Sequence, residues 1–202
     1  MPRAFSADEN DHIRSRLRAA GAEAFARRGL RGTTVEELAR AAGISKGAFY
    51  RFYDSKDALL LALVDEYETA AHAEIETAVR ARPERGISYL VDSAVHALES
   101  HQLLMVLMSE EGLRALHTAT VEQRAVLLER DVRLVHRVLS VMQESGVAVD
   151  LPERVLVGLL RSLVFVGHHR DEIGPDLLEE VSTWLQQTLL TTLRPLPASP
   201  GL

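Results

Sequence analysis

Residues 43–47 are GISKG and match the pattern G-x-S-x-G, in which a serine hydroxyl can act as a nucleophile. In serine hydrolases this pattern forms a strained turn between a buried strand and a helix. The residues before Gly43, TTVEELARAA, are rich in Glu and Ala, and that composition favours a helix over a strand. Since no strand is predicted to hold the turn, Ser45 is not expected to be a nucleophile, and we predict no enzymatic activity.

A tight turn between two helices is the second interpretation of the same residues. A helix-turn-helix needs a small residue where the helices cross and a residue in the turn that tolerates a positive φ angle, and Ala39 and Gly43 supply them. It also needs apolar side chains that anchor the pair to a neighbouring helix, and these are Leu38, Ala42, Ile44, Phe49 and Phe52. The sequence therefore predicts a motif whose second helix enters the major groove of DNA.

Histidine side chains are candidate metal ligands. His168 and His169 are adjacent, so on a helix they point about 100° apart and suit a single site poorly. Glu172 improves that geometry only if the helix continues to that point, and His96 and His101 are too far apart to share a helix face. The sequence has no cysteine, which excludes disulfides and thiolate ligands. We predict no metal site and no cofactor.

Helical elements must position the turn at Gly43. Apolar residues recur at helical spacing along most of the chain, and no convincing period-two alternation marks a strand, so we predict an all-α fold. The first predicted helices cover about 9–28, 34–43, 45–53 and 55–82. Their candidate caps are Thr33 or Thr34 (with Glu36 or Glu37 completing a capping box), Ser45, and Asp54 or Ser55.

The second half of the chain continues with helices at about 84–100, 102–117 and 121–145. In DLPER, Asp150 is the predicted cap of a further helix, with Pro152 in its first turn and Glu153 closing a capping box. The last helix follows GPD at 174–176, and the Pro-rich end at 195–202 is predicted to be disordered.

Composition and charge limit the possible partners. The 202 residues are 47% hydrophobic with a net charge of −6, yet residues 1–57 hold 11 Lys and Arg against 8 Asp and Glu. A basic N-terminal quarter in an acidic protein indicates one local site for a polyanion. The start of the chain lacks the apolar core of a signal peptide, and the apolar run ALLLALV is too short to cross a bilayer. We therefore predict a cytoplasmic protein without a membrane partner.

The segment TTVEELARAAGISKGAFYRFYDSKDALLLAL resembles the DNA-binding segment of the tetracycline-repressor (TetR) family, and the resemblance covers about residues 10–64. It implies a homodimeric repressor that leaves its double-stranded operator DNA when a small molecule binds. It also implies a three-helix DNA-binding domain at 1–57, with a flexible arm at 1–8, and a helical ligand-binding and dimerisation domain at 58–194. The alternative is an architectural or division factor whose C-terminal domain only dimerises or binds a protein.

The resemblance also implies roles for individual residues of the motif. Thr34 and Lys56 match phosphate contacts, and Gly47 and Ala48 match small residues that let the helix approach base edges. Ser45, Lys46 and Tyr50 match contacts to the DNA backbone or near the bases. Arg51 stands at a variable position, where it could read guanine or lie near a phosphate. Phe52 departs from the family pattern, because it stands where the family often has a polar aromatic residue that binds phosphate.

Two further sets of residues concern the C-terminal domain. Flexible Met side chains suit an adaptable pocket for an apolar effector, although the same stretch can be plain core. The predicted pocket residues are Leu104, Met105, Met108, Phe165 and His168. The segment VLVGLLRSLVFVGHH is apolar nearly all round, which indicates either a dimer interface or a fully buried helix in a monomer. The predicted interface residues are Leu159, Leu163, Val181, Trp184 and Leu185.

Overall fold

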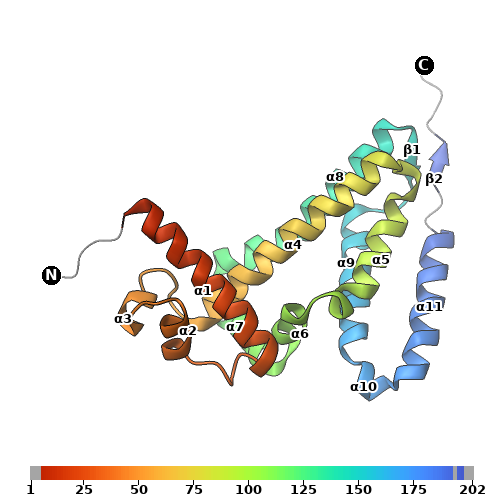
Figure 1. Ribbon diagram of the computed structural model, residues 1–202. Helices are drawn as coiled ribbons and strands as arrows, with labels where there is room; N and C mark the ends of the chain where they lie inside the picture. Colours follow the sequence, from red (N-terminus) through yellow and green to blue (C-terminus); the bar gives the residue numbers. More distant parts are fainter. Residues whose placement is uncertain (1–5, 193–194, 198–202) are drawn as a thin grey trace. The chain divides into compact units, whose positions relative to one another are not determined.

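The computed structural model describes residues 6–192 and 195–197, and the regular elements of this part are helices except for two strands of three residues each (Figure 1). The predicted all-α fold is confirmed, with the strands as a small addition. The chain divides into two compact units, Met1–Tyr67 with Gln102–Thr120 and Glu68–His101 with Val121–Leu202. Helix α4 (Lys56–Ala81) passes from the first unit into the second.

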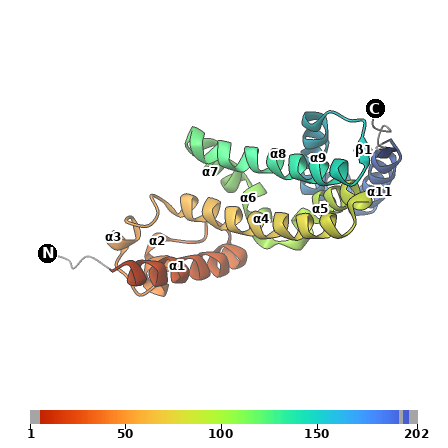
Figure 2. The same ribbon diagram turned by 90° about the horizontal axis from the view of Figure 1, so that it is seen from above.

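The first unit contains α4 up to Tyr67 and five further helices. Helix α1 packs against α2 and α6, and Figure 2 shows α1 beside α2. Ser6 caps α1 with a capping box to Glu9, so the helix begins within the predicted arm at 1–8, of which residues 1–5 lie outside the described residues. The five helices are α1 (Ala7–Arg28), α2 (Val35–Ala41), α3 (Lys46–Phe49), α6 (Gln102–Met108) and α7 (Glu110–Thr118).

Close packing of α1 on α4 depends on Gly21. A Cβ atom at this position would lie 2.9 Å from Cδ2 of Leu59 and 3.2 Å from Cδ1 of Leu63, so a larger residue would displace these leucine side chains. The core around this crossing is fully buried, and its largest side chains are Leu17, Phe25, Leu38, Phe49, Leu59, Leu60 and Val64. This core holds α2 and α3 against α1 and α4.

The helix predicted at 102–117 is two helices, because Ser109 caps a new one. Its side-chain oxygen accepts a hydrogen bond from the Gly112 amide at 3.2 Å. A Cβ atom at Gly112 would lie 2.3 Å from the carbonyl oxygens of Val106 and Leu107, so the break between α6 and α7 requires glycine there. Apolar spacing alone did not predict this break.

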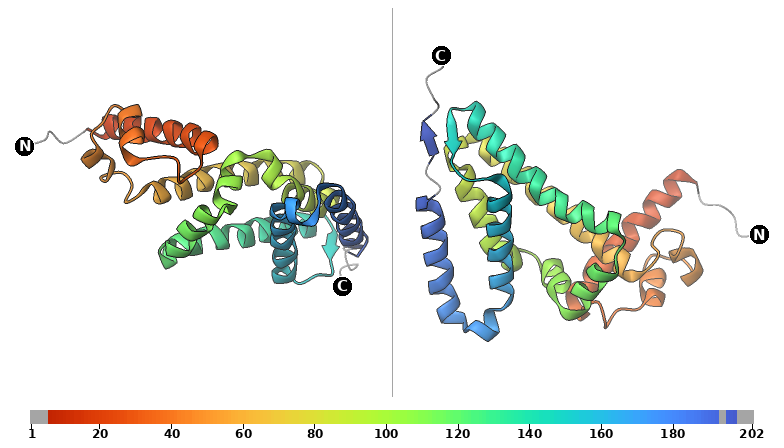
Figure 3. Two further views of the ribbon diagram at one scale, coloured as in Figure 1. Left: turned by 90° about the horizontal axis from the view of Figure 1, so that it is seen from below. Right: turned by 180° about the vertical axis from the view of Figure 1, so that it is seen from behind.

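The second unit is built around α5, which packs against α8, α9 and α11 (Figure 3). Its core contains Val79, Val91, Val135, Met142 and Leu156, all almost fully buried. The elements are a 3-10 turn η1 (Pro83–Arg85), α5 (Gly86–Ser100), α8 (Val121–Glu144), β1 (Val147–Val149), α9 (Glu153–His168), α10 (Arg170–Ile173), α11 (Pro175–Thr192) and β2 (Pro195–Pro197).

Two sequence predictions are wrong near β1. Asp150 does not cap α9, because Pro152 occupies the N-cap position and no side chain caps the helix there. Pro195–Pro197, which were assigned to a disordered tail, pair antiparallel with β1, with Ala148 opposite Leu196. Proline has no backbone N–H, so Leu196 is the residue of β2 that can donate to β1. The rest of that tail, 198–202, lies outside the described residues.

The division into units differs from the predicted domains at 1–57 and 58–194. Helices α6 and α7 belong to the same unit as α1, α2 and α3, and the predicted boundary at residue 57 lies inside α4. No helix in the described part of the chain is long and apolar enough to span a bilayer.

Candidate nucleic-acid interface

Helix α2 begins at a complete capping box. The Thr34 side chain accepts from the Glu37 amide at 3.3 Å, and the Glu37 carboxylate accepts from the Thr34 amide at 3.1 Å. Arg28 donates to both carboxylate oxygens of Glu37, at 3.0 and 3.3 Å, which ties the end of α1 to the start of α2. Hydrogen bonds from the Thr34 backbone and hydroxyl, followed by Arg28, lower the pKa of Glu37. The sequence left Thr33 with Glu36 and Thr34 with Glu37 open as the capping pair, and the structure has Thr34 with Glu37.

The GISKG segment forms the turn of a helix-turn-helix. Gly43 has a φ angle of 72°, which favours glycine, and the Ile44 amide donates to the Ala39 carbonyl at 2.9 Å. Ser45 caps α3, since its hydroxyl accepts from the Ala48 amide at 3.2 Å. Helix α2 precedes the turn, whereas a nucleophile elbow requires a strand there. Ser45 is therefore a helix cap in a turn and not the serine of an elbow.

Buried aromatic and aliphatic residues hold α3 in place. Phe49 is fully buried and its ring lies 5.6 Å from that of Tyr50 and 6.1 Å from that of Tyr53, centroid to centroid. Helical hydrogen bonding continues beyond α3, with the Tyr53 amide donating to the Phe49 carbonyl at 3.1 Å. Phe52 is half-buried, in agreement with a packing role for this departure from the family pattern.

Five of the predicted DNA-binding residues lie together on the exposed side of α3 and its flanks. Ser45, Lys46, Gly47, Tyr50 and Arg51 are all exposed, and Ala48 next to them is half-buried. A Cβ atom at Gly47 would meet no atom within 4 Å, so the fold itself leaves this surface open. Thr34 is exposed at the start of α2.

Lys46 is held by an ion pair with Glu36 of α2. The hydrogen bond from Lys46 lowers the pKa of Glu36, and the hydrogen bond to Glu36 raises the pKa of Lys46. Both side chains are more than half exposed, so solvent and salt weaken the pair. The sequence analysis did not predict this pairing, although the opposite charges on neighbouring helices were a signal for it.

Lys56 lies apart from this exposed group. Its ammonium donates to the carbonyl oxygens of Leu30 and Thr33, at 2.7 and 2.8 Å, in a partly buried contact. The expected contact of Lys56 with a phosphate stays a prediction, since two of its three N–H donors are used inside the protein and the third is left for it.

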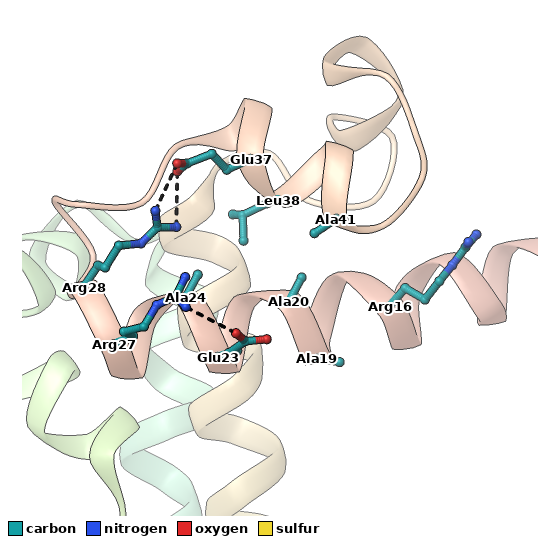
Figure 4. A pocket seen from close by; sticks show the side chains of 10 residues that line it. All are labelled: Arg16, Ala19, Ala20, Glu23, Ala24, Arg27, Arg28, Glu37, Leu38 and Ala41. Atoms are coloured by element: carbon teal, nitrogen blue, oxygen red, sulfur yellow. Dashed lines mark hydrogen bonds and ion pairs between the residues drawn. The ribbon is translucent and has the colours of Figure 1, made fainter.

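A groove of about 340 Å³ lies between α1 and α2. Figure 4 shows alanine side chains along it and two ion pairs at its edge, Arg28 with Glu37 and Arg27 with Glu23. Arg16 lies at one end of the groove, and its Nη1 atom is 3.2 Å from where a Cβ atom of Gly43 would be. The sequence analysis did not single out Arg16, which brings a third exposed cation to the turn of the motif, beside Lys46 and Arg51.

The predicted ligand-pocket residues fall in different units. Leu104 and Met108 are buried in the first unit, and Met105 beside them is exposed. Phe165 is exposed and His168 is half-buried on α9 of the second unit. The pocket stays a prediction. Among the described residues, no three His, Cys, Asp or Glu side chains are placed to hold a metal ion.

The predicted dimer residues divide into core and surface positions. Leu163 belongs to the core of the second unit, and Leu185 packs against that core. Leu159 and Trp184 are exposed, the latter by 63%, and Val181 is half-buried. Leu163 is thus better explained as a core residue, while Leu159 and Trp184 remain available to a partner.

A network of partly buried charges joins α4, α8 and α9 in the second unit. Arg130 donates to Glu68 at 2.8 Å, Arg137 to Glu76 at 2.6 Å and Arg161 to Asp131 at 2.9 Å. Burial, and then the nearby Asp131 carboxylate, raise the pKa of Glu68 to about 8, whereas Arg161 acts in the opposite direction. Burial also lowers the pKa of His72, whose Nδ1 atom is buried without a partner among the described residues. The sequence analysis missed these residues, although Glu68, His72 and Glu76 recur at four-residue spacing.

Comparison with known proteins supports the helix-turn-helix. The family described as "Bacterial regulatory proteins, tetR family" matches residues 17–63, from the middle of α1 into α4. YerO of Bacillus subtilis, an uncharacterized HTH-type transcriptional regulator, is 51% identical over 43 residues. Those residues make up 21% of this chain and 15% of YerO, so the chain matches only a small part of that relative.

Solved structures share the fold over nearly the whole chain. A TetR-family regulator from Pectobacterium atrosepticum has a TM-score of 0.71 at 19% identity, covering 95% of this chain and 100% of that one. FadR from Bacillus subtilis, in complex with stearoyl-CoA, has a TM-score of 0.62 at 17% identity, covering 89% and 99%. The family match at the motif and this shared helical fold agree with the resemblance of the segment around GISKG, and residues 17–63 belong to the tetR family of bacterial regulatory proteins.

Proposed function

We propose that this protein is a ligand-responsive transcriptional repressor. It binds operator DNA through α3 and leaves the DNA when a small molecule binds the C-terminal helices. The observation that supports DNA binding best is the open surface at Gly47, with exposed Lys46, Tyr50 and Arg51 around it. No described residue fills this surface, and a helix that lies in the major groove needs such a close approach to base edges.

The residues around Gly47 have different tasks in this proposal. Lys46 exchanges its Glu36 partner for a phosphate, and the exposed Thr34 at the start of α2 lies where free N–H groups also favour phosphate. Arg51 is the candidate for reading a base, because arginine can donate two hydrogen bonds to guanine. The excess of Lys and Arg in residues 1–57 favours approach of DNA to this unit.

Two copies of the chain are needed to read an operator with two half-sites. We propose that the second copy covers four exposed apolar side chains of α9 and α11, which are Val155, Leu159, Leu177 and Trp184. Large apolar patches of this kind are uncommon on monomers and mark interaction sites. Half-sites about 34 Å apart, or a multiple of that, would let both α3 helices dock.

The effector is proposed to be apolar. The FadR neighbour was crystallised with stearoyl-CoA, and the exposed Met105 and Phe165 offer apolar surface in each unit of this chain. The proposed setting is the cytoplasm, and the proposed role involves no enzymatic step.

Selection from random duplexes, followed by a binding titration of the selected site, tests the DNA-binding part. We expect one enriched site with two related half-sites, bound at least a hundredfold more tightly than mixed-sequence DNA. A thermal-shift screen that includes stearoyl-CoA and free fatty acids tests the effector part, since a ligand that binds only the folded state raises the melting temperature. One outcome of the screen is that no compound both raises the melting temperature and weakens operator binding. If the protein nevertheless binds an operator, the architectural or division factor becomes the better proposal.

A further inference from the structure

Lys56 begins α4 and reaches back to the turn between α1 and α2. Ser55 caps the helix, with its hydroxyl accepting from the Ala58 amide at 3.0 Å. This cap fixes the backbone from which the Lys56 side chain extends. The ammonium then donates to the carbonyls of Leu30 and Thr33, which are 26 and 23 residues earlier in the chain.

The turn that receives Lys56 is itself buried. Leu30 is 4% exposed and Thr33 is fully buried, and the Thr33 hydroxyl donates to the Gly29 carbonyl at 2.9 Å. The one backbone bond across the turn, from the Thr33 amide to the Leu30 carbonyl, is long at 3.4 Å. The two charge-assisted bonds from Lys56 are shorter, so they are the stronger restraint on these carbonyls. Without them, the Thr33 carbonyl would lose this partner and the Leu30 carbonyl would keep only the long bond from the Thr33 amide.

The start of α2 depends on this turn. Thr33 directly precedes Thr34, whose side chain and backbone form the capping box of α2. Any shift of the Thr33 carbonyl therefore moves the residue from which α2 begins. Helix α2 in turn packs against α3, so the position of α3 follows from that of α2.

We propose that Lys56 is a positioning residue, which fixes the start of α2 on the first turn of α4 and makes no phosphate contact. This inference rests on the proposed DNA-binding function. Because α4 is continuous from Lys56 to Ala81, Lys56 joins the turn before α2 to the first turn of that long helix. The same side chain thus sets the geometry of the DNA-binding motif and links it to the helix that enters the second unit.

Lys56→Met tests the inference, because methionine keeps much of the length of the side chain but cannot donate. Amide hydrogen exchange in the free protein should become several-fold faster at Glu37 and Leu38, whose amides bond to Thr34. Arg31→Met is the matched control, since Arg31 is an exposed cation of the same turn. Exchange at α2 should not change in this control. Equal exchange in Lys56→Met and wild type would overturn the proposal.

The salt dependence of binding to a mixed-sequence 40-base-pair duplex separates the two roles of Lys56. A lost phosphate contact would reduce the slope of log K against log salt by about 1 per subunit. We expect Lys56→Met to bind more weakly with an unchanged slope, and a slope reduced by about 1 would overturn the proposal.

If Lys56→Met does not fold, amide hydrogen exchange and DNA binding are measured on Lys56→Arg instead. Arginine keeps the charge but replaces the compact ammonium by a planar group, so we expect faster exchange at α2 and weaker DNA binding here too. Full DNA affinity with wild-type exchange would show that the charge alone matters. If the wild type itself binds no DNA, the proposed function fails, while hydrogen exchange still decides whether Lys56 fixes the turn.

Discussion

Lys46 of α3 forms an ion pair with Glu36 of α2, so the first cation of the recognition helix has an internal partner before any DNA arrives. A phosphate that binds Lys46 must displace this carboxylate, which also repels the phosphate. Both effects act against every DNA sequence alike, because neither involves a base. If Lys46 binds a phosphate as proposed, we expect Glu36 to limit the affinity of the protein for DNA in general.

Glu36→Gln should strengthen binding to both operator and mixed-sequence DNA, by roughly threefold at low salt and less at high salt. Fluorescence anisotropy at several salt concentrations measures the change. Glu23→Gln is the control, because Glu23 pairs with Arg27 on α1 and its replacement changes the net charge by the same amount. Weaker binding by Glu36→Gln, or equal gains in both variants, would contradict a specific effect of Glu36 on Lys46.

Gly47→Leu should abolish DNA binding without loss of stability. A side chain at this position meets nothing inside the protein, and glycine is a poorer helix former than leucine. The new side chain would stand between α3 and the base edges. Urea unfolding should show an unchanged or higher free energy of unfolding, while operator binding falls by at least a hundredfold. Ala19→Leu, at an exposed position of α1, is the control and should bind DNA normally.

Local signals allowed the helix-turn-helix to be predicted from the sequence. The capping box joins Thr34 to a residue three positions away, and the positive φ angle at Gly43 depends on glycine itself. The cap of α3 by Ser45 is equally local. Such features need no knowledge of the rest of the fold, so composition and spacing were enough.

Contacts between distant parts of the chain could not be predicted in this way. Lys56 meets the carbonyl of Leu30 across 26 residues, and Arg130 meets Glu68 across 62. Family resemblance assigned Lys56 a phosphate contact but did not predict its two carbonyl contacts, because a pattern of residue types does not show which groups a side chain reaches. Helix propensity also concealed the break at Ser109, where apolar spacing continues but the local hydrogen bonds begin a new helix.

The chain should sediment at about twice its mass of 22.4 kDa, because in the proposed dimer a second copy covers the exposed apolar side chains of α9 and α11. Trp184→Glu places a charge at the most exposed of these apolar side chains and should give a folded monomer. Val132→Glu, at an exposed position of α8, should remain a dimer. A monomeric wild type at micromolar concentration would contradict the proposed interface.

Stability of the second unit should depend on pH through Glu68. Its ordinary pKa is 4.5 and in the folded protein it is about 8, so folding takes up a proton between these values. The free energy of unfolding therefore falls as pH rises through this interval, by up to about 1.4 kcal/mol per pH unit. Glutamine cannot ionise. Glu68→Gln should therefore remove the contribution of residue 68 to the fall in the free energy of unfolding.

Urea unfolding at pH 5, 6, 7 and 8, at one protein concentration, measures the effect of Glu68. Glu76→Gln is the control, because Glu76 lies two turns along α4 and is also paired with an arginine. It should keep the pH dependence of the wild type. The 2.8 Å contact from Arg130 favours the ionised form of Glu68 and opposes the effect of burial. If that ion pair outweighs burial, Glu68→Gln will be less stable by a constant amount at every pH, and the raised pKa will be wrong.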